Sequence, residues 1–217
     1  MCWQENEVAA VGDDAIRETG SMKKMLSDVA NFRTGYLFRG KVKPDPAGGV
    51  RVVQIKDIDA DQKIRVGDLT PVNLDRPDPY MTRSGDVLFL NRGHRLYPVV
   101  VPDVAANTIA TGYFFILRPN PSLIVPEYLA LALNQPEFQD SLRPYLRGSH
   151  IPMVSRTDVE GLRIEVPPLD VQRRILMLNN LLEDERRLSA AIYERRRQLV
   201  QAVSRTLMQA PVTERTE

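Results

Sequence analysis

The spacing of apolar residues changes its period at one point of the chain, and this change predicts a boundary. Residues 162–166 alternate apolar and polar side chains, the period-two pattern of a half-buried strand. Pro167 and Pro168 follow directly, and they end the strand because proline has no N–H to donate to a neighbouring strand. From Val171 onward apolar residues recur at every third or fourth position, with Asp170 before them as the predicted N-cap. The pattern predicts one long helix over about residues 171–208, roughly 55 Å long at 1.5 Å per residue.

Upstream of the two prolines, short apolar runs bounded by proline- and glycine-rich segments predict strands. Residues 87–90 are apolar without interruption, as expected of a buried strand, whereas residues 23–32 fit either one or two helical turns or the entry to a strand. The order, strands first and helices later, predicts an α+β fold rather than regular alternation. The predicted strands are 50–55, 87–90, 97–101, 108–117 and 162–166, and the predicted helices are 126–134, 136–146 and 171–208.

These patterns predict four parts of the chain. Residues 1–20 show little periodicity and are expected to be a flexible leader. Residues 21–168 form the mixed domain, residues 169–209 the helical arm and residues 210–217 a tail.

The apolar stripe of the predicted arm is interrupted by Glu185, Ser189 and Arg196. A long helix with such a stripe can pack against another long helix, where polar positions cost stability but specify register and partner. The alternative is a single helix packed on its own domain. Its length and the prolines before it favour a helix pair, a coiled coil, with the stripe as the contact: Ile175, Leu178, Leu182, Ile192, Leu199 and Val203.

Composition narrows the class of protein. The chain has 217 residues, 43% of them hydrophobic and 26% charged, which fits one globular domain with an appendage. No apolar run approaches the roughly 20 residues of a membrane span, and the acidic start does not resemble a signal peptide, so a cytoplasmic protein without membrane contact is expected. A single cysteine and two separated histidines, His94 and His150, lead us to expect no metal site and no cofactor.

Catalytic motifs are incomplete. Asp78-Pro79-Tyr80 resembles the end of an adenine methyltransferase motif but lacks its second proline, and no glycine-rich cofactor turn accompanies it. Asp45 followed by Lys56 imitates the acid and lysine of a metal-dependent nuclease, but Gln54 stands where a second carboxylate is needed. The sequence therefore favours a non-catalytic protein, with a metal-dependent DNA endonuclease kept as an alternative.

Several short motifs, weak individually, occur in the order found in one family. The chain resembles the target recognition domain and following helix of type I restriction-modification specificity subunits over residues 22–208. The motifs that carry the resemblance are Leu26-Ser27-Asp28-Val29 through Gly35, Val53-Gln54-Ile55-Lys56-Asp57-Ile58, Ser84-Gly85-Asp86-Val87-Leu88, Pro126-Glu127-Tyr128-Leu129, Gly148-Ser149, and Ile164-Glu165-Val166-Pro167-Pro168-Leu169 with Gln172.

The resemblance implies a function and partners. Family members usually carry two recognition domains and two helical spacers, and this chain is similar to half of that arrangement. A second copy paired antiparallel through the long helix would restore it, and identical halves imply an interrupted palindromic target in double-stranded DNA. A heterodimer with a different half subunit is the alternative. The expected partners are a DNA methyltransferase subunit, directed to adenines in the target, and a restriction subunit.

Net charge is only +1, so the predicted DNA contacts depend on particular loops. Arginine and lysine can donate to guanine O6 and N7, and asparagine can pair with adenine, so loops that combine these residue types suit base readout. Phosphate contact or a solvated loop is the alternative at each position. The predicted DNA-binding residues are Asn91, Arg92, His94 and Arg95 in a first loop, Arg147, Ser149 and His150 in a second, and Arg39, Lys41 and Lys43 in a third.

A third class of function stays open. A half subunit that competes for the methyltransferase without directing it would bind the partner but would not bind DNA sequence-specifically. The resemblance favours a non-catalytic, DNA-reading specificity subunit over this regulatory protein.

Overall fold

The computed structural model describes residues 20–104, 108–148 and 150–209. The chain divides into two compact units, Met1–Arg173 and Arg174–Glu217, and each is described by itself. Almost all of the expected leader, residues 1–20, and the whole expected tail, residues 210–217, lie outside the described residues.

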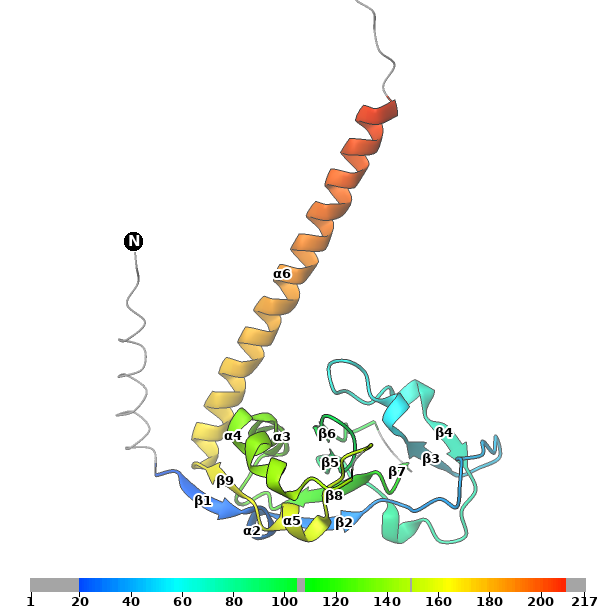
Figure 1. The fold of residues 1–217 in the computed structure, drawn as a ribbon, viewed down its shortest axis with the longest axis vertical. Coiled ribbons are helices and arrows are strands. Elements are labelled where there is room, and N and C mark those ends of the chain that lie inside the picture. The colour runs from blue at the N-terminus through cyan, green and yellow to red at the C-terminus, as the bar shows by residue number, and fades with distance from the viewer. Residues whose placement is uncertain (1–19, 105–107, 149, 210–217) are drawn as a thin grey trace, which may run out of the picture. The chain divides into compact units, whose positions relative to one another are not determined.

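The first unit is built around a four-stranded antiparallel sheet (Figure 1). Its strand order is β2 (Ala30–Thr34), β8 (Phe114–Pro119), β5 (Val87–Leu90) and β6 (Pro98–Val100). Every residue of β5 is buried, as its uninterrupted apolar sequence predicts. Thr34 pairs with Phe115 and Leu90 pairs with Phe114, so β2 and β5 both end beside the start of β8.

A three-stranded sheet packs against the first. Its order is β4 (Thr70–Val72), β3 (Val50–Val53) and β7 (Thr108–Ala110), with β3 and β7 parallel. Val53 and Ala110 share one hydrophobic cluster with Leu88 and Phe114 of the larger sheet, whereas Val50 and Val52 belong to a second cluster. Alternate residues of β3 therefore enter different clusters, as the period of a strand requires.

Two predicted strands differ from the structure. Residues 108–117 form two strands, β7 and β8, in different sheets, because the chain turns at Thr111–Tyr113 between them. Residues 50–55 form β3 only as far as Val53, and a 3-10 helix, η1 (Ile55–Asp57), follows. The strand propensity of both segments predicts continuous strands, but the turns that interrupt them depend on contacts with backbone that is distant in sequence.

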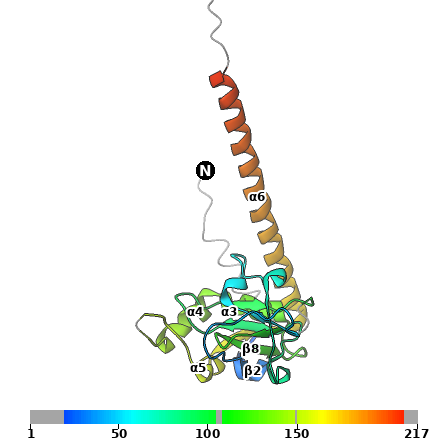
Figure 2. The same ribbon diagram turned by 90° about the vertical axis from the view of Figure 1, so that its right-hand side faces the viewer.

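Small helices complete the first unit, and several are visible in Figure 2. They are α2 (Leu26–Val29), α3 (Pro126–Asn134), α4 (Pro136–Leu142) and α5 (Arg156–Glu160), with the short 3-10 helices η2 (Val66–Asp68), η3 (Asp78–Tyr80) and η4 (Arg143–Tyr145). The second predicted helix, 136–146, is thus divided into α4 and η4, while β4 and α5 were not predicted. The strand-rich core with small helices and a long C-terminal helix confirms the predicted α+β class.

The predicted strand before the prolines is β9 (Arg163–Val166), whose side chains alternate between exposed and buried. It pairs antiparallel with β1 (Met22–Met25). The long helix, α6 (Leu169–Gln209), begins before the predicted N-cap, so Asp170 lies within its first turn. A carboxylate there still stabilises the helix through its dipole.

Gln172 lies in the first turns of α6 and has no exposed surface. Its Oε1 accepts a hydrogen bond from the backbone N–H of Val125 at 2.9 Å. Its Nε2 donates to the backbone carbonyls of Leu123 and Pro167, each at 2.8 Å. One side chain thereby joins the segment before α3 to the chain that leaves β9, all within the first unit.

From Arg174 onward, α6 constitutes the second unit. The helix has 41 residues, about 60 Å at 1.5 Å per residue. Several apolar side chains of its stripe are exposed, among them Leu178 at 66%, Leu182 at 63% and Leu199 at 64%. Arg186 pairs with Glu183, Arg187 with Asp184 and Arg197 with Glu194, at 2.8–2.9 Å. In the described part of the chain, no helix combines the length and apolar character needed to cross a bilayer.

Candidate nucleic-acid interface

Two of the loops predicted to contact DNA are joined by backbone hydrogen bonds. The N–H of Gly93 donates to the carbonyl of Pro152 at 2.8 Å, and the N–H of Val154 donates to the carbonyl of Asn91 at 3.0 Å. Arg147 and Met153 exchange reciprocal backbone bonds at 2.8 Å. The loop after β5 and the loop after η4 are far apart in sequence, and these bonds make them neighbours.

Glycines permit the shape of both loops. Gly93 has a φ of 121° and Gly148 a φ of 102°, in the left-handed region that residues with a Cβ rarely adopt. At Gly148 a Cβ would also lie 2.9 Å from the carbonyl oxygen of Ile151. Both positions therefore depend on glycine to bring the flanking basic residues to the same edge.

The third predicted loop reaches the same edge through the turn between β7 and β8. Asn91 donates its backbone N–H to the carbonyl of Tyr113 at 2.9 Å and its Nδ2 to the carbonyl of Gly112 at 3.0 Å. The N–H of Gly112 donates in turn to the carbonyl of Tyr36, at 2.8 Å, three residues before the third loop. Because β2 and β5 end beside the start of β8, this turn links all three predicted loops.

Aromatic packing holds the third loop against the smaller sheet. The rings of Tyr36 and Phe38 lie 4.7 Å apart between centroids, and those of Tyr36 and Tyr80 lie 5.0 Å apart, both edge to face. Phe38 and Val42 pack on the cluster of β3 and β4 residues. These anchors leave Lys41, between them in sequence, exposed at the edge.

The predicted DNA-binding residues differ in accessibility. Arg92 is half-buried, and its guanidinium lies 4.6 Å from the centroid of the Tyr113 ring, a cation–π distance. Asn91 is only 8% exposed and uses its side-chain amide to hold the turn. Ser149 lies outside the described residues. The exposed residues are Arg39, Lys41, Lys43, His94, Arg95, Arg147 and His150.

Arg147 is also engaged in the structure. Its guanidinium lies 3.4 Å from a carboxylate oxygen of Asp158, although its side chain is 72% exposed. An exposed pair of this kind contributes at most about 1 kcal/mol, so an incoming phosphate can compete for the arginine.

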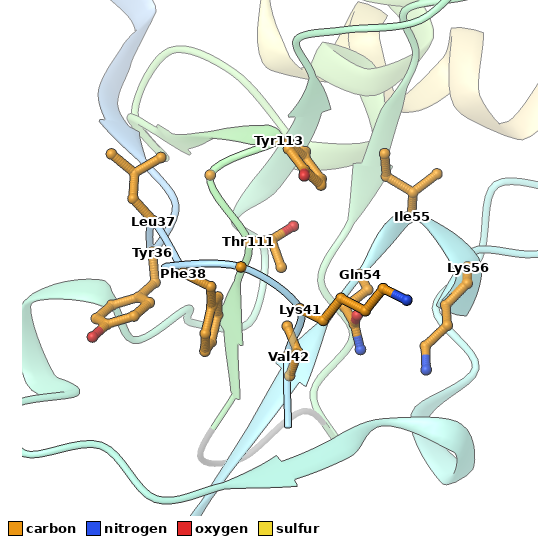
Figure 3. Close-up of a pocket in the computed structure, with 12 residues that line it drawn as sticks. Tyr36, Leu37, Phe38, Lys41, Val42, Gln54, Ile55, Lys56, Thr111 and Tyr113 are labelled. Carbon is orange, nitrogen blue, oxygen red and sulfur yellow. The ribbon is translucent and has the colours of Figure 1, made fainter. Parts of the chain in front are cut away.

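A pocket opens between the third loop, the turn after β3 and the turn between β7 and β8. Its volume is about 680 Å³, within the range of small-ligand sites. Figure 3 shows Lys41 and Lys56 with Gln54 near them, and Thr111 between Lys41 and Tyr113. Lys41 is among the DNA contacts predicted from the sequence. Tyr113 is not, because it falls within the predicted strand 108–117.

Asp57 holds the turn that contributes Gln54 and Lys56 to the pocket. Its carboxylate accepts the backbone N–H of Gln54 at 2.8 Å and the residue is 2% exposed. Burial raises the pKa of Asp57, while the Gln54 N–H and the nearby Lys56 act in the opposite direction. The hydrogen bond holds the turn that carries Gln54 and Lys56.

Comparison with known proteins decides the family. Residues 18–185 match the family model described as the type I restriction modification DNA specificity domain. The chain belongs to this family. The chain therefore contains a DNA specificity domain of the kind found in type I restriction-modification systems.

Relatives of the specificity domain include longer proteins. The chain is 26% identical over 125 residues to the type I restriction enzyme HindI specificity subunit of Haemophilus influenzae, an alignment that covers 56% of this chain and 27% of that subunit. The HsdS subunit of Thermoanaerobacter tengcongensis shares 24% identity and a TM-score of 0.63, over 91% of this chain and 51% of that one. The S subunit of M. genitalium shares 14% identity and a TM-score of 0.54, over 88% and 46%. The chain spans about half the length of the solved relatives.

Asp45 and Lys56, the residues of the nuclease alternative, do not form the arrangement of a metal-dependent nuclease site. Asp45 uses its carboxylate to accept the backbone N–H of Ala47 at 3.0 Å, as turn residues do. Lys56 lies in the wall of the pocket. Among the described residues, no group of three or more histidine, cysteine, aspartate or glutamate side chains is placed to hold a metal ion.

Proposed function

We propose that this chain is a half-length specificity subunit that reads one half of a split DNA site with its first unit and uses α6 as spacer and dimer contact. Family membership gives the DNA specificity role. The proposed DNA-facing edge is the surface formed by the three predicted loops. The observation that supports it is that these loops come from distant parts of the sequence and are linked through hydrogen bonds of Asn91, Gly112 and Gly93.

Within this proposal the edge residues have different tasks. His94, Arg95 and His150 are exposed and stand on loops held by backbone bonds, which suits base readout. Lys43, Arg39 and Arg147 are exposed charges suited to phosphate contact, which sets position on the duplex but carries no sequence information. Asn91, being buried, positions the turn for its neighbours and does not touch a base itself.

Pairing of α6 with a second copy is supported by the spacing of its apolar residues. Leu178, Leu182, Ile192 and Leu199 fall on alternating three- and four-residue steps, which they share with the polar positions Glu185, Ser189 and Arg196. Their exposed surface in the single chain is available to a partner helix. Two identical chains around a two-fold axis read an interrupted palindrome, and a different second half would read an asymmetric site.

The chain would act together with enzymatic subunits in the cytoplasm. We propose that α6 also provides the docking site for an adenine methyltransferase subunit, and that a restriction subunit joins through it. The regulatory alternative, a half subunit that binds the methyltransferase but reads no DNA, makes the same complex without sequence-specific binding.

The decisive experiment is genome-wide adenine methylation in a cell that expresses this chain with its methyltransferase subunit, compared with the methyltransferase alone. The proposal requires a split motif methylated only when the chain is present. We expect Arg95→Ala with Arg147→Ala to abolish or relax the motif. Arg163→Ala, an exposed arginine of β9 away from the three loops, is the matched control and should leave it unchanged.

The alternatives give different outcomes. A palindromic motif supports the homodimer, whereas an asymmetric motif points to a second kind of half subunit. A verified complex with no new methylation would contradict the DNA-reading role and favour the regulatory one.

A further inference from the structure

The pocket at the DNA-facing edge has a chemical character that the general proposal does not use. Its walls carry the aromatic ring of Tyr113 and the apolar side chains of Leu37, Val42 and Ile55. Its polar groups are the amide of Gln54, the hydroxyl of Thr111 and the ammonium groups of Lys41 and Lys56. A flat ring with hydrogen-bonding edges and a neighbouring negative charge matches both sets of groups, and a nucleotide has these features.

Thr111 is the observation that points to a ligand. Its side chain lines the pocket and is 6% exposed, and its Oγ1 is buried with no hydrogen-bond partner among the described residues. Buried hydroxyls are nearly always hydrogen-bonded, so an orphan in the wall of a pocket indicates a partner that comes from outside the chain. Figure 3 places Thr111 between Tyr113 and Lys41, whose long side chain can move aside for a ligand.

Two further features prepare the pocket. The ring of Tyr113 is 43% exposed and is held by the Arg92 guanidinium 4.6 Å from its centroid, so a rigid aromatic surface stands ready for stacking. Gln54 donates one N–H of its amide to Thr70 Oγ1 at 3.0 Å, which fixes the amide in place. Lys41 and Lys56, from separate loops, supply positive charge at the same side.

The shape of the pocket favours one nucleotide over a base pair in the groove. Side chains that read a duplex project into the groove, whereas a hollow of about 680 Å³ receives a group that projects from the DNA. Proteins take single bases out of the stack into such pockets and read them by stacking and edge hydrogen bonds.

We propose that the pocket binds one everted nucleotide of the target DNA. Its base stacks on Tyr113 and bonds to Thr111 and Gln54, and its phosphate lies by Lys41 and Lys56. This inference rests on the proposed function, because it needs the chain to bind DNA at this edge. The inference goes beyond the proposed function in one respect: recognition includes the unpairing of a second base, in addition to the adenine that is methylated.

The test uses the full chain with the methyltransferase subunit and duplexes of the motif found by methylation mapping. A fluorescent analogue, 2-aminopurine at purine positions and pyrrolocytosine at pyrimidine positions, replaces one base at a time. Because methyltransferases evert their own target base, a signal at the methylated adenine is expected in any case and is set aside. We expect one additional position in each half-site to brighten on binding.

Matched variants assign that signal to the pocket. Thr111→Val removes only the hydroxyl and should lower affinity for the normal duplex about fivefold, the effect of one hydrogen bond, and weaken the added fluorescence. Thr157→Val, on the exposed side of α5, should change neither. An abasic site at the brightened position should make the wild-type chain and Thr111→Val bind equally, because no base is left to contact the hydroxyl.

The outcomes separate this inference from the proposed function. A wild-type complex that binds DNA and directs methylation, but brightens no second position, would overturn the inference alone. A pocket that holds only a phosphate would also overturn the inference. In that case, one methylphosphonate in the DNA would cancel the effect of Lys41→Ala and Lys56→Ala on affinity. Every fluorescent probe outside the methylated adenine would stay dark. A chain that neither binds DNA nor directs methylation would overturn the proposed function as well.

Discussion

At the scale of single residues, polar groups buried in the first unit determine both its stability and its chemistry. Gln172 satisfies three backbone groups from inside the protein, whereas the hydroxyl of Thr111 satisfies none among the described residues. A buried polar group that is hydrogen-bonded stabilises its surroundings, and one without a partner costs free energy. The two residues should therefore respond to substitution in opposite directions.

Replacing Gln172 by leucine should destabilise the chain. The change keeps the volume close to that of glutamine but leaves the N–H of Val125 and the carbonyls of Leu123 and Pro167 without their partner. We expect a loss of roughly 3 kcal/mol in the free energy of unfolding, measured by urea denaturation of the full chain. Arg173→Leu, exposed and next in sequence, should stay within about 0.5 kcal/mol. Equal stability of the two variants would contradict the role given to Gln172.

Replacing Thr111 by valine should do the reverse. Valine has nearly the same shape, and it removes a buried hydroxyl that has no described partner. The free energy of unfolding without DNA should rise by about 1 kcal/mol while DNA binding weakens, the trade between stability and function expected at a binding site. Thermal unfolding of the free chain measures the first effect. A clear loss of stability would show that the hydroxyl already has a structural partner.

At the scale of elements, α6 carries apolar and charged residues in a pattern that a single helix does not require. Its ion pairs at i and i+3, such as Glu194 with Arg197, lie on the exposed surface of the helix and support it weakly. The hydrogen bond from Arg197 lowers the pKa of Glu194, so this carboxylate stays ionised and the pair weakens only in acid. Exposed leucines contribute nothing of this kind, and the proposed partner helix would account for their spacing.

Leu182→Lys should weaken self-association. Full burial of a leucine side chain contributes roughly 1.5–3 kcal/mol, so the dimer dissociation constant should rise at least about tenfold. Ala191→Lys is the control, because its position lies half a turn away around the helix and is also exposed. Sedimentation equilibrium of the full chain measures both variants. A wild-type monomer, or equal dimers in the two variants, would contradict the proposed helix pair.

At the scale of the whole molecule, the proposed dimer turns the length of α6 into the spacing between the two half-sites of the target. In the proposed antiparallel pair each helix separates two recognition units, so its length sets the gap between half-sites. The chain spans about half the length of the solved relatives.

Inserting one heptad in the exposed part of α6 should change which sites are methylated. Seven residues keep the apolar register but lengthen the helix by about 10 Å, the rise of roughly three base pairs. Dimer mass should be retained while methylation of the original motif is lost, as read by methylation mapping. Unchanged methylation of the original sites would show that the helix does not set the spacing.

The sequence by itself determined what depends on local order. The period-two pattern of residues 162–166, the two prolines and the three- and four-residue spacing after them specified β9 and α6, since backbone periodicity acts between near neighbours. The buried strand at residues 87–90 and the helix at 126–134 followed for the same reason. The order of short motifs along the chain indicates the family without any geometry.

Only the tertiary structure decided what depends on distant backbone. Strand propensity could not show that residues 108–117 turn at Gly112, because the turn is held by Asn91 and Tyr36 from other parts of the chain. The same contacts gather the three basic loops, bury Asn91 and expose Tyr113. Composition could propose which residues bind DNA, but which of them reach solvent, and the pocket that Thr111 lines, arise from packing between segments that no local pattern connects.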